Sequence, residues 1–217
     1  MNEFFYGKYQ QFLTAFGDVM VATRPPSTKA KQILGMAEWL TRGNVICRYY
    51  CSYLDSVFIP GEFTHSGLIV NPDQIIHSIA EGVGIVHPID FVKDTDGFII
   101  LRPPYATHDA IEKAASRAHW HLDNGTQYDF SFNDPSKFYC HEFTVDCLMS
   151  GGIEGIPLVK KSFGVFPFRF ERELYLADAI IQKCSTEYAF RGRYRKGIGE
   201  TLASSRREMA GIKGGSK

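Results

Sequence analysis

The sequence lacks three features that would each point to a particular class of protein. It has no excess of one charge, since 24 Lys and Arg balance 24 Asp and Glu among its 217 residues. This balance gives no general attraction to nucleic acid or to anionic membranes. No stretch reaches the roughly 18–20 apolar residues that a membrane-spanning helix needs. Repeats and low-complexity segments are also absent, so we expect a globular protein without a transmembrane segment or a strong nucleic-acid signal.

The sequence also lacks the dense, even set of cysteines that a disulfide scaffold requires. Its cysteines number five and are widely spaced: Cys47, Cys51, Cys140, Cys147 and Cys184. We read them as free thiols in a reducing compartment. The first 20 residues contain no apolar run of the signal-peptide kind, and the expected location is therefore the cytoplasm.

Composition predicts one folded domain followed by a short basic tail. Hydrophobic residues make up 44% and aromatic residues 14% of the chain, which is enough for a sizeable core. Between Arg191 and Lys217, Lys and Arg outnumber Asp and Glu eight to two, so residues 1–190 carry a net charge of −6. We expect a single domain, large enough for an enzyme, over residues 1–190. A flexible basic tail over residues 191–217 can contact an anionic partner.

Periodicity and turn residues predict an α+β domain, a small antiparallel sheet flanked by helices. We expect Ser27 to cap the second helix, and Asn71-Pro72-Asp73 to form a turn between antiparallel strands. Residues 43–62 give no clear pattern. The expected helices cover 5–16, 27–40, 108–122, 140–149 and 171–184. The expected strands cover 19–22, 63–70, 74–80, 83–87 and 97–102.

One cysteine and two histidines stand where thiol chemistry would need them. Cys140 opens a predicted helix, whose free N–H groups and partial positive charge favour a thiolate. His65 lies in a predicted strand and is the candidate base, while His77, across the predicted turn, can orient its ring. The alternative without catalysis is that Cys140 is a buried core thiol and that both histidines are packed structural side chains.

A zinc site is a weaker reading of the remaining histidines. His119 and His121 are two residues apart on a predicted helix, where side chains do not share a face, and no carboxylate or cysteine has ligand spacing beside them. We therefore expect neither a metal nor a cofactor.

Four segments in order resemble the circularly permuted papain-like proteins of the NlpC/P60 superfamily, specifically the YiiX/YaeF-type permuted amidases. More distant relatives include the lecithin retinol acyltransferase group. The segments are Gly17-Asp18-Val19, Thr64-His65-Ser66-Gly67-Leu68-Ile69, Ile75-Ile76-His77-Ser78 with Gly82-Val83, and Tyr128-Asp129-Phe130-Ser131-Phe132 with Tyr139-Cys140-His141-Glu142-Phe143.

The resemblance implies a permuted papain-like fold and a cysteine hydrolase that cleaves an amide or ester through an acyl-enzyme. By it Cys140 is the nucleophile, His65 the base and His77 the orienting residue, although Glu81 is an alternative for the last role. Tyr128, Asp129 and Tyr139 then contact the substrate, a peptide or an acyl lipid, or Asp129 caps a turn instead. A lipid acyltransferase or phospholipase and a non-enzymatic module are the alternatives, and a phage or virion-associated origin fits a cell-wall peptidase without an export signal.

Overall fold

The computed structural model describes residues 25–50, 61–165 and 168–192. The predicted helix 5–16 and strand 19–22 lie outside these ranges, as do Gly17-Asp18-Val19, Cys51 and nearly all of the basic tail. Within the described ranges no helix has the length and apolarity needed to cross a bilayer.

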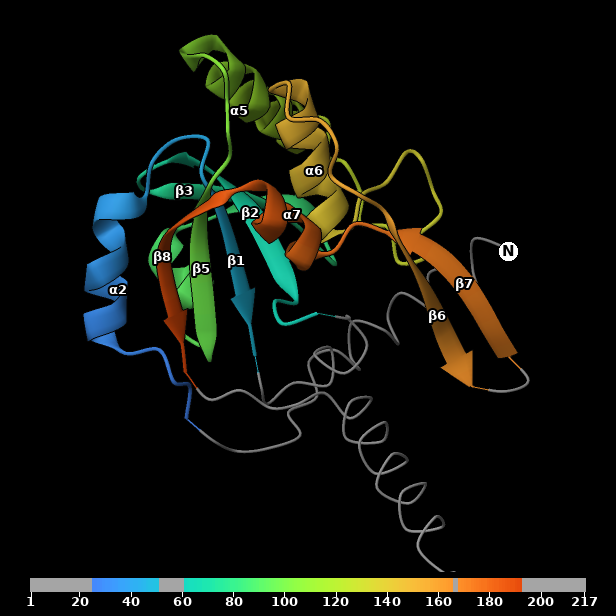
Figure 1. Ribbon diagram of the computed structural model, residues 1–217, viewed down its shortest axis with the longest axis horizontal. Coiled ribbons are helices and arrows are strands. Elements are labelled where there is room, and N and C mark those ends of the chain that lie inside the picture. Colours follow the sequence, from blue (N-terminus) through green and yellow to red (C-terminus); the bar gives the residue numbers. More distant parts are fainter. Residues whose placement is uncertain (1–24, 51–60, 166–167, 193–217) are drawn as a thin grey trace, which may run out of the picture.

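The core of the fold is a six-stranded antiparallel sheet in the order β4-β3-β2-β1-β5-β8, shown in Figure 1. The strands are β1 (Val45–Tyr49), β2 (His65–Asn71), β3 (Gln74–Ile79), β4 (Gly82–Val86), β5 (Gly97–Arg102) and β8 (Ser185–Arg191). The four strands predicted between residues 63 and 102 are confirmed, as is the antiparallel pairing of β2 with β3. The turn between them is tightened by the Asp73 N–H, which donates to Asn71 Oδ1 over 2.9 Å.

Side chains of successive strand residues point to opposite faces, and each face of this sheet has its own apolar cluster. Ile46, Ile69 and Ile75 pack with Phe91 on one face. Leu68 and Ile76 pack with Phe143 on the other. The first face is covered by α2 (Ala30–Met36), the 3-10 helix η1 (Ala37–Trp39) and α4 (Pro88–Val92). The second face is covered by α5 (His108–Asp123), α6 (Cys140–Ser150) and α7 (Ala177–Lys183).

A separate hairpin leaves this layered body. Strands β6 (Val159–Val165) and β7 (Phe168–Leu174) pair with each other and not with the large sheet. In Figure 1 the hairpin points away from the six-stranded sheet on the side of α6. Near its base, Leu174 packs with Tyr139 and Leu176 in a small cluster of its own.

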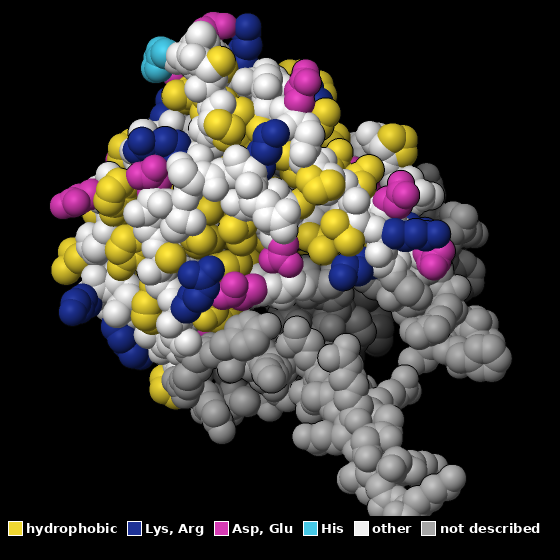
Figure 2. All heavy atoms as spheres, viewed as in Figure 1, with side chains coloured by type: hydrophobic (Ala, Val, Ile, Leu, Met, Phe, Trp, Pro, Cys, Tyr) yellow, Lys and Arg dark blue, Asp and Glu magenta, His cyan; other side chains and the backbone are white. Residues whose placement is uncertain are grey.

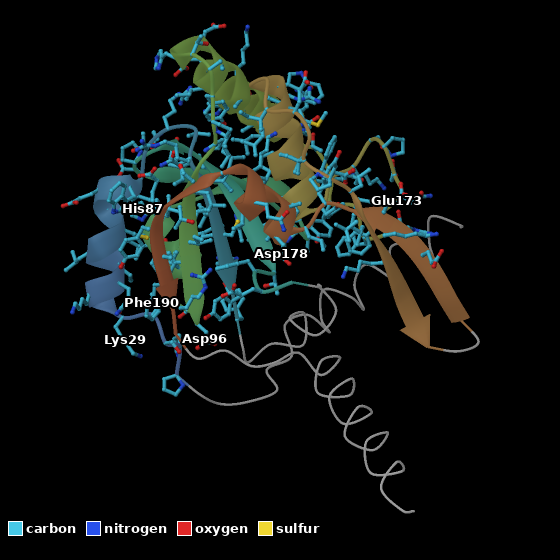
Figure 3. The ribbon with its side chains drawn as sticks, in the orientation of Figure 1. Lys29, His87, Asp96, Glu173, Asp178 and Phe190 are labelled. Atoms are coloured by element: carbon cyan, nitrogen blue, oxygen red, sulfur yellow. The ribbon has the colours of Figure 1, made fainter. Side chains whose placement is uncertain are left out.

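Two local expectations are wrong, and one segment without a predicted structure forms a strand. The predicted helix 171–184 is shortened to α7, because its first residues pair with β6 as part of β7. The ambiguous segment 43–62 contributes β1, which lies in the middle of the sheet. Ser27 does not cap α2, whose N-cap is Lys29. The Ser27 hydroxyl instead donates to Asp96 over 2.7 Å, at the lower edge of the sheet in Figure 3.

The described surface carries charges of both signs in a mixed pattern. Figure 2 shows Lys and Arg side chains interspersed with Asp and Glu side chains over the face in view, with apolar side chains between them. Several of these charges form exposed ion pairs, such as Lys93 with Asp90 and Lys160 with Glu171. No strongly charged patch of one sign stands out on this face.

Candidate active site

His65 and His77 come together at the start of β2. Nε2 of His65 lies 2.8 Å from Nδ1 of His77, and the two ring planes meet at 74°. Antiparallel pairing of β2 and β3 around the short turn at Pro72 puts the two side chains on the same face of the sheet. In a neutral imidazole one nitrogen donates and the other accepts, so two arrangements fit this contact. The arrangement that catalysis can use has the His65 Nε2–H donating to His77 Nδ1. It leaves Nδ1 of His65 as the nitrogen that can take up another proton.

Both imidazoles lie in surroundings that disfavour their charged form. Phe91 of α4 packs 5.5 Å from each ring, measured between centroids. Arg48 is the cross-strand partner of His65, and its guanidinium lies 4.2 Å from the Phe91 ring centre. Burial and then the Arg48 charge lower the pKa of His77 to about 3. The same causes, in the same order, lower the pKa of His65 well below its usual value. Both rings are therefore neutral at neutral pH, the state in which an imidazole acts as a base.

Cys140 is the first residue of α6, with Tyr139 as the N-cap. Its side chain is 2% exposed, and its thiol donates to the carbonyl oxygen of Thr64 over 3.8 Å. Burial raises the pKa of the thiol to about 12, although backbone N–H groups of Ser66 and His141 act in the opposite direction. The expectation that the helix start would lower this pKa is therefore wrong, because loss of hydration outweighs the helix.

The thiol and the histidine pair meet at the same point of β2 without bonding directly. The sulfur contacts the backbone on either side of His65, through the Thr64 carbonyl and the Ser66 N–H. The His65 ring packs toward Phe91 on the α4 face of the sheet. Among the residues that the structure describes, no hydrogen bond joins the Cys140 thiol to His65 or His77.

The two candidates for the orienting residue have different surroundings. His77 is 5% exposed and bonds directly to His65. Glu81 is exposed, in the turn between β3 and β4. The geometry therefore favours His77 over Glu81 as the partner of His65.

The predicted substrate-contacting residues Tyr128, Asp129 and Tyr139 precede Cys140 in the sequence, and two of them have internal hydrogen-bond partners. Asp129 is 1% exposed, and its carboxylate accepts four hydrogen bonds within its own loop, from the Ser131 N–H and hydroxyl and the N–H groups of Asn133 and Asp134. This is the turn-capping arrangement that the sequence left open.

Tyr139 is held in a similar way by the segment that follows β7. Its hydroxyl accepts the Tyr175 N–H over 2.6 Å, and its ring packs 5.1 Å from Phe132 between centroids. Tyr128 is half-buried and lies 4.8 Å from the Phe130 ring between centroids. These aromatic side chains form an apolar border beside the start of α6.

Sequence reasoning missed the residues that fix α6 to the sheet. Ser66 is fully buried, and its hydroxyl lies 2.8 Å from His141 Nδ1, 2.9 Å from the Thr144 hydroxyl and 3.3 Å from the Cys140 carbonyl. Nε2 of His141 forms no hydrogen bond within the described ranges, although the nearby Phe63 carbonyl favours the protonated ring. Burial dominates and lowers the pKa of His141 to about 4. The available signal was the position of Ser66 after a strand histidine, which puts it on the opposite face.

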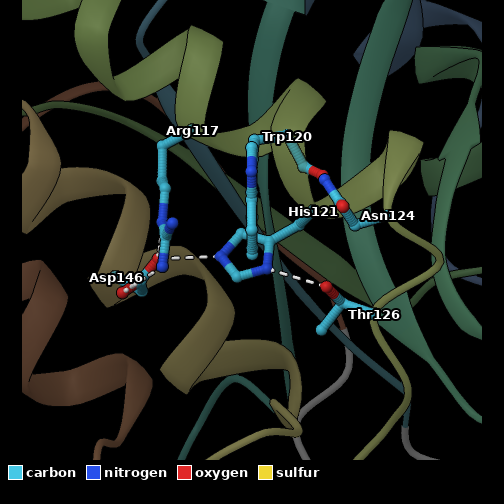
Figure 4. Close-up of polar contacts among 6 residues, drawn as sticks. All are labelled: Arg117, Trp120, His121, Asn124, Thr126 and Asp146. Atoms are coloured by element: carbon cyan, nitrogen blue, oxygen red, sulfur yellow. Dashed lines mark hydrogen bonds and ion pairs between the residues drawn. The ribbon is translucent and has the colours of Figure 1, made fainter.

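A second buried histidine joins α6 to α5, as Figure 4 shows. His121 is fully buried, with Nε2 2.8 Å from Asp146 Oδ2 and Nδ1 3.0 Å from the Thr126 hydroxyl. Arg117 donates to the same Asp146 oxygen over 2.6 Å. His121 is therefore part of a network between helices, and His119 is not part of it. Across the described ranges no group of three or more His, Cys, Asp or Glu is arranged to hold a metal ion.

Comparison with known proteins gives one family and one fold. A family model described as permuted papain-like amidase enzyme, YaeF/YiiX, C92 family, matches residues 39–159. The crystal structure of the metalloprotein yiiX from Escherichia coli O157:H7 is similar, with a TM-score of 0.55 and 13% sequence identity. The alignment covers 71% of this chain and 98% of that chain, which confirms the permuted papain-like fold. None of the curated proteins compared with this sequence matches it.

Proposed function

The chain belongs to the family of permuted papain-like amidases of the YaeF/YiiX type, which supports a cysteine hydrolase of the amidase type. On this premise we propose that it cleaves an amide bond with Cys140 as nucleophile, His65 as base and His77 as the residue that orients His65. The observation that carries this proposal is the 2.8 Å contact between the two imidazoles. It leaves one nitrogen of His65 unused, next to the strand backbone that the thiol contacts.

The proposed resting state is a neutral thiol and a neutral imidazole. A thiol pKa raised to about 12 and a His65 pKa below its usual range both oppose a preformed ion pair. The proton therefore moves when the nucleophile attacks, not before. In the resting arrangement the thiol hydrogen points to the Thr64 carbonyl, and the His65 ring packs against Phe91 on the opposite face of the sheet. Proton transfer to Nδ1 of His65 therefore requires both groups to move past the start of β2.

The chemical steps then follow those of a cysteine acyl-enzyme. The sulfur bonds to the substrate carbonyl carbon while its proton passes to His65. The C–N bond breaks, and the leaving amine takes the proton from His65. Water adds to the thioester and gives a proton to His65, and the S–C bond then breaks to release a carboxylic acid and restore the thiol.

Backbone N–H groups near the sulfur supply the stabilisation of negative charge that this route needs. The N–H groups of Ser66 and His141 both favour the charged form of the thiol, so they face the sulfur that attacks the substrate carbonyl. Fixed donors in a site that excludes water are effective because they need not reorganise during the reaction. In this proposal they form the oxyanion site.

The similar yiiX structure is described as a metalloprotein, which raises the question of a metal at this site. The described residues do not provide such a site, since no cluster of three ligands is present among them. The proposed steps are therefore carried by side chains and backbone groups alone.

Alkylation by iodoacetamide near neutral pH tests the proposal. We expect preferential modification of Cys140 over Cys47, Cys51, Cys147 and Cys184, located by peptide mapping, because His65 takes the proton as the sulfur attacks. His65→Ala should suppress this modification, whereas His87→Ala, a surface histidine that is labelled in Figure 3, should not. Equal labelling of all five cysteines, or full labelling of Cys140 without His65, would contradict an activated nucleophile.

A second experiment, which compares peptide and lipid substrates, identifies the substrate class. We expect the wild-type protein, and not Cys140→Ser, to hydrolyse peptide amides such as those of peptidoglycan fragments. The apolar cluster of Tyr139, Leu174 and Leu176, in which Tyr139 directly precedes Cys140, favours an acyl lipid as the second candidate. Incubation with acylated lipids distinguishes the two, because a lipid acyltransferase would move the acyl group to an amine or to water while leaving peptides intact.

A further inference from the structure

The dipeptide His-Ser occurs twice in the paired strands, as His65-Ser66 in β2 and His77-Ser78 in β3. Since side chains alternate along a strand, the histidines point to one face and the serines to the other. The histidine face is the one on which Phe91 packs. The serine face is the one on which α6 packs. Two serines beside the histidine pair thus reach the segment that carries Cys140.

Ser66 holds the first turn of α6. Its hydroxyl donates to the Cys140 carbonyl over 3.3 Å and lies within 2.9 Å of both the His141 ring nitrogen and the Thr144 hydroxyl. Thr144 also donates to the Cys140 carbonyl, over 3.0 Å. All four residues are buried, so these hydrogen bonds do not compete with water and are costly to leave unmade.

Ser78 holds the residues just before α6. Its hydroxyl donates to the Phe138 carbonyl over 2.6 Å, and the Phe138 N–H donates to the Gln127 carbonyl over 3.1 Å. Ser78 is fully buried. The segment from Phe138 to Cys140 is therefore attached to β3 at one end and to β2 at the other.

We propose that Ser66 and Ser78 are positioning residues, which hold the Cys140 segment in register with the His65–His77 pair on the other face of the sheet. The inference rests on the proposed function, because the position of the thiol relative to the imidazole matters only if the two groups take part in one reaction. Each serine is covalently adjacent to one histidine, so a shift of the helix start relative to the strands changes the distance between thiol and His65. Displacements of about 1 Å are enough to slow a reaction strongly.

The test measures the rate of Cys140 alkylation by iodoacetamide as a function of pH. We expect Ser66→Ala and Ser78→Ala to lower the rate near neutral pH by about tenfold each, which corresponds to one lost hydrogen bond in a positioned site. The midpoint of the pH profile should move upward, since the thiol loses its base. Ser66→Thr keeps the hydroxyl and should restore much of the rate.

Thr95→Val is the matched control for lost stability. The Thr95 hydroxyl is also fully buried and donates to a carbonyl, that of Val92, over 2.8 Å, but it lies on the loop after α4. We expect this variant to lower the thermal unfolding temperature as the serine variants do, without changing the pH profile of alkylation. Equal shifts of the profile in Thr95→Val and in the serine variants would overturn the positioning role.

A double-mutant cycle with His65→Ala separates the two proposals. If Ser66 acts through the thiol–imidazole register, Ser66→Ala should have no further effect on alkylation once His65 is removed. Additive effects would contradict the inference alone. Failure of the wild-type protein to label Cys140 preferentially would instead refute the proposed function, and the inference with it.

Discussion

Mild acid should destabilise this protein through its buried histidines. The pKa of His77 is lowered to about 3 and that of His141 to about 4, in each case mainly by burial. The pKa of an unfolded histidine is about 6.5. A folded pKa below the unfolded one means that the unfolded chain binds the extra proton, so the stability that is present above about pH 6.5 is lost as the pH falls toward the folded value.

The size of this effect follows from the protons that each state binds. His65 shifts in the same direction as His77 and His141, so unfolding takes up about three protons near pH 5.5. Glu142 acts in the opposite direction, because burial raises its pKa to about 7 and the folded state holds its proton. A net uptake of about two protons corresponds to about 2.7 kcal/mol of unfolding free energy per pH unit. Domains of this size have about 5–15 kcal/mol in total, so one pH unit removes a large share.

Urea unfolding followed by circular dichroism between about pH 7 and pH 5 measures this slope. His141→Asn should reduce it by about 1.4 kcal/mol per pH unit, because one fewer group takes up a proton on unfolding. A wild-type stability that stays constant over this range, or an unaltered slope in His141→Asn, would refute the reasoning.

Three further substitutions have defined outcomes. Asp146→Ala should lower the unfolding free energy by about 3 kcal/mol, because it removes the carboxylate that binds the buried Nε2 of His121 and the half-buried guanidinium of Arg117. Loss of the exposed Asp90 carboxylate should have no measurable effect, and urea unfolding measures both. Gly67→Ala should destabilise by about 1–3 kcal/mol and slow Cys140 alkylation, since its Cβ would lie 2.7 Å from the Ile75 side chain and 3.0 Å from the Ile76 carbonyl. Gly84→Ala is the control, because its Cβ would meet only Ile79, at 3.9 Å. Asp129→Ala should loosen the loop it caps, seen as faster hydrogen exchange at residues 131–134, and unchanged exchange there would contradict the capping role.

The elements that the sequence predicted correctly are those with a strong local signal. The apolar runs around Leu68 and Ile76, separated by Asn71-Pro72-Asp73, define the β2–β3 pair without any knowledge of the rest of the fold. Helix α6 begins at Cys140 and ends just before Gly151, as the pattern indicated. The expectation failed for 171–184, where the strand partner of β7 comes from β6 and is not visible as a local pattern.

The candidate site shows the same division. The residue types and their order pointed to Cys140, His65 and His77 and to the permuted papain-like family, and hairpin geometry predicted that the two histidines would meet. The pKa of the thiol was predicted in the wrong direction, because the effect of a helix start is local whereas burial depends on everything packed around the sulfur. The contact of the thiol with the Thr64 carbonyl was equally invisible in the sequence.

By itself, the sequence determined the four strands between residues 63 and 102 and the family, and it indicated Cys140, His65 and His77 as candidate catalytic residues, because alternation, turn chemistry and motif order are properties of neighbouring residues. Only the tertiary structure decided that Ser66 and Ser78 bond the segment before and at Cys140, and that His141 and His121 are buried hydrogen-bonding residues. These contacts join residues 20 or more positions apart. They depend on how α5 and α6 pack against the sheet, which no local pattern specifies.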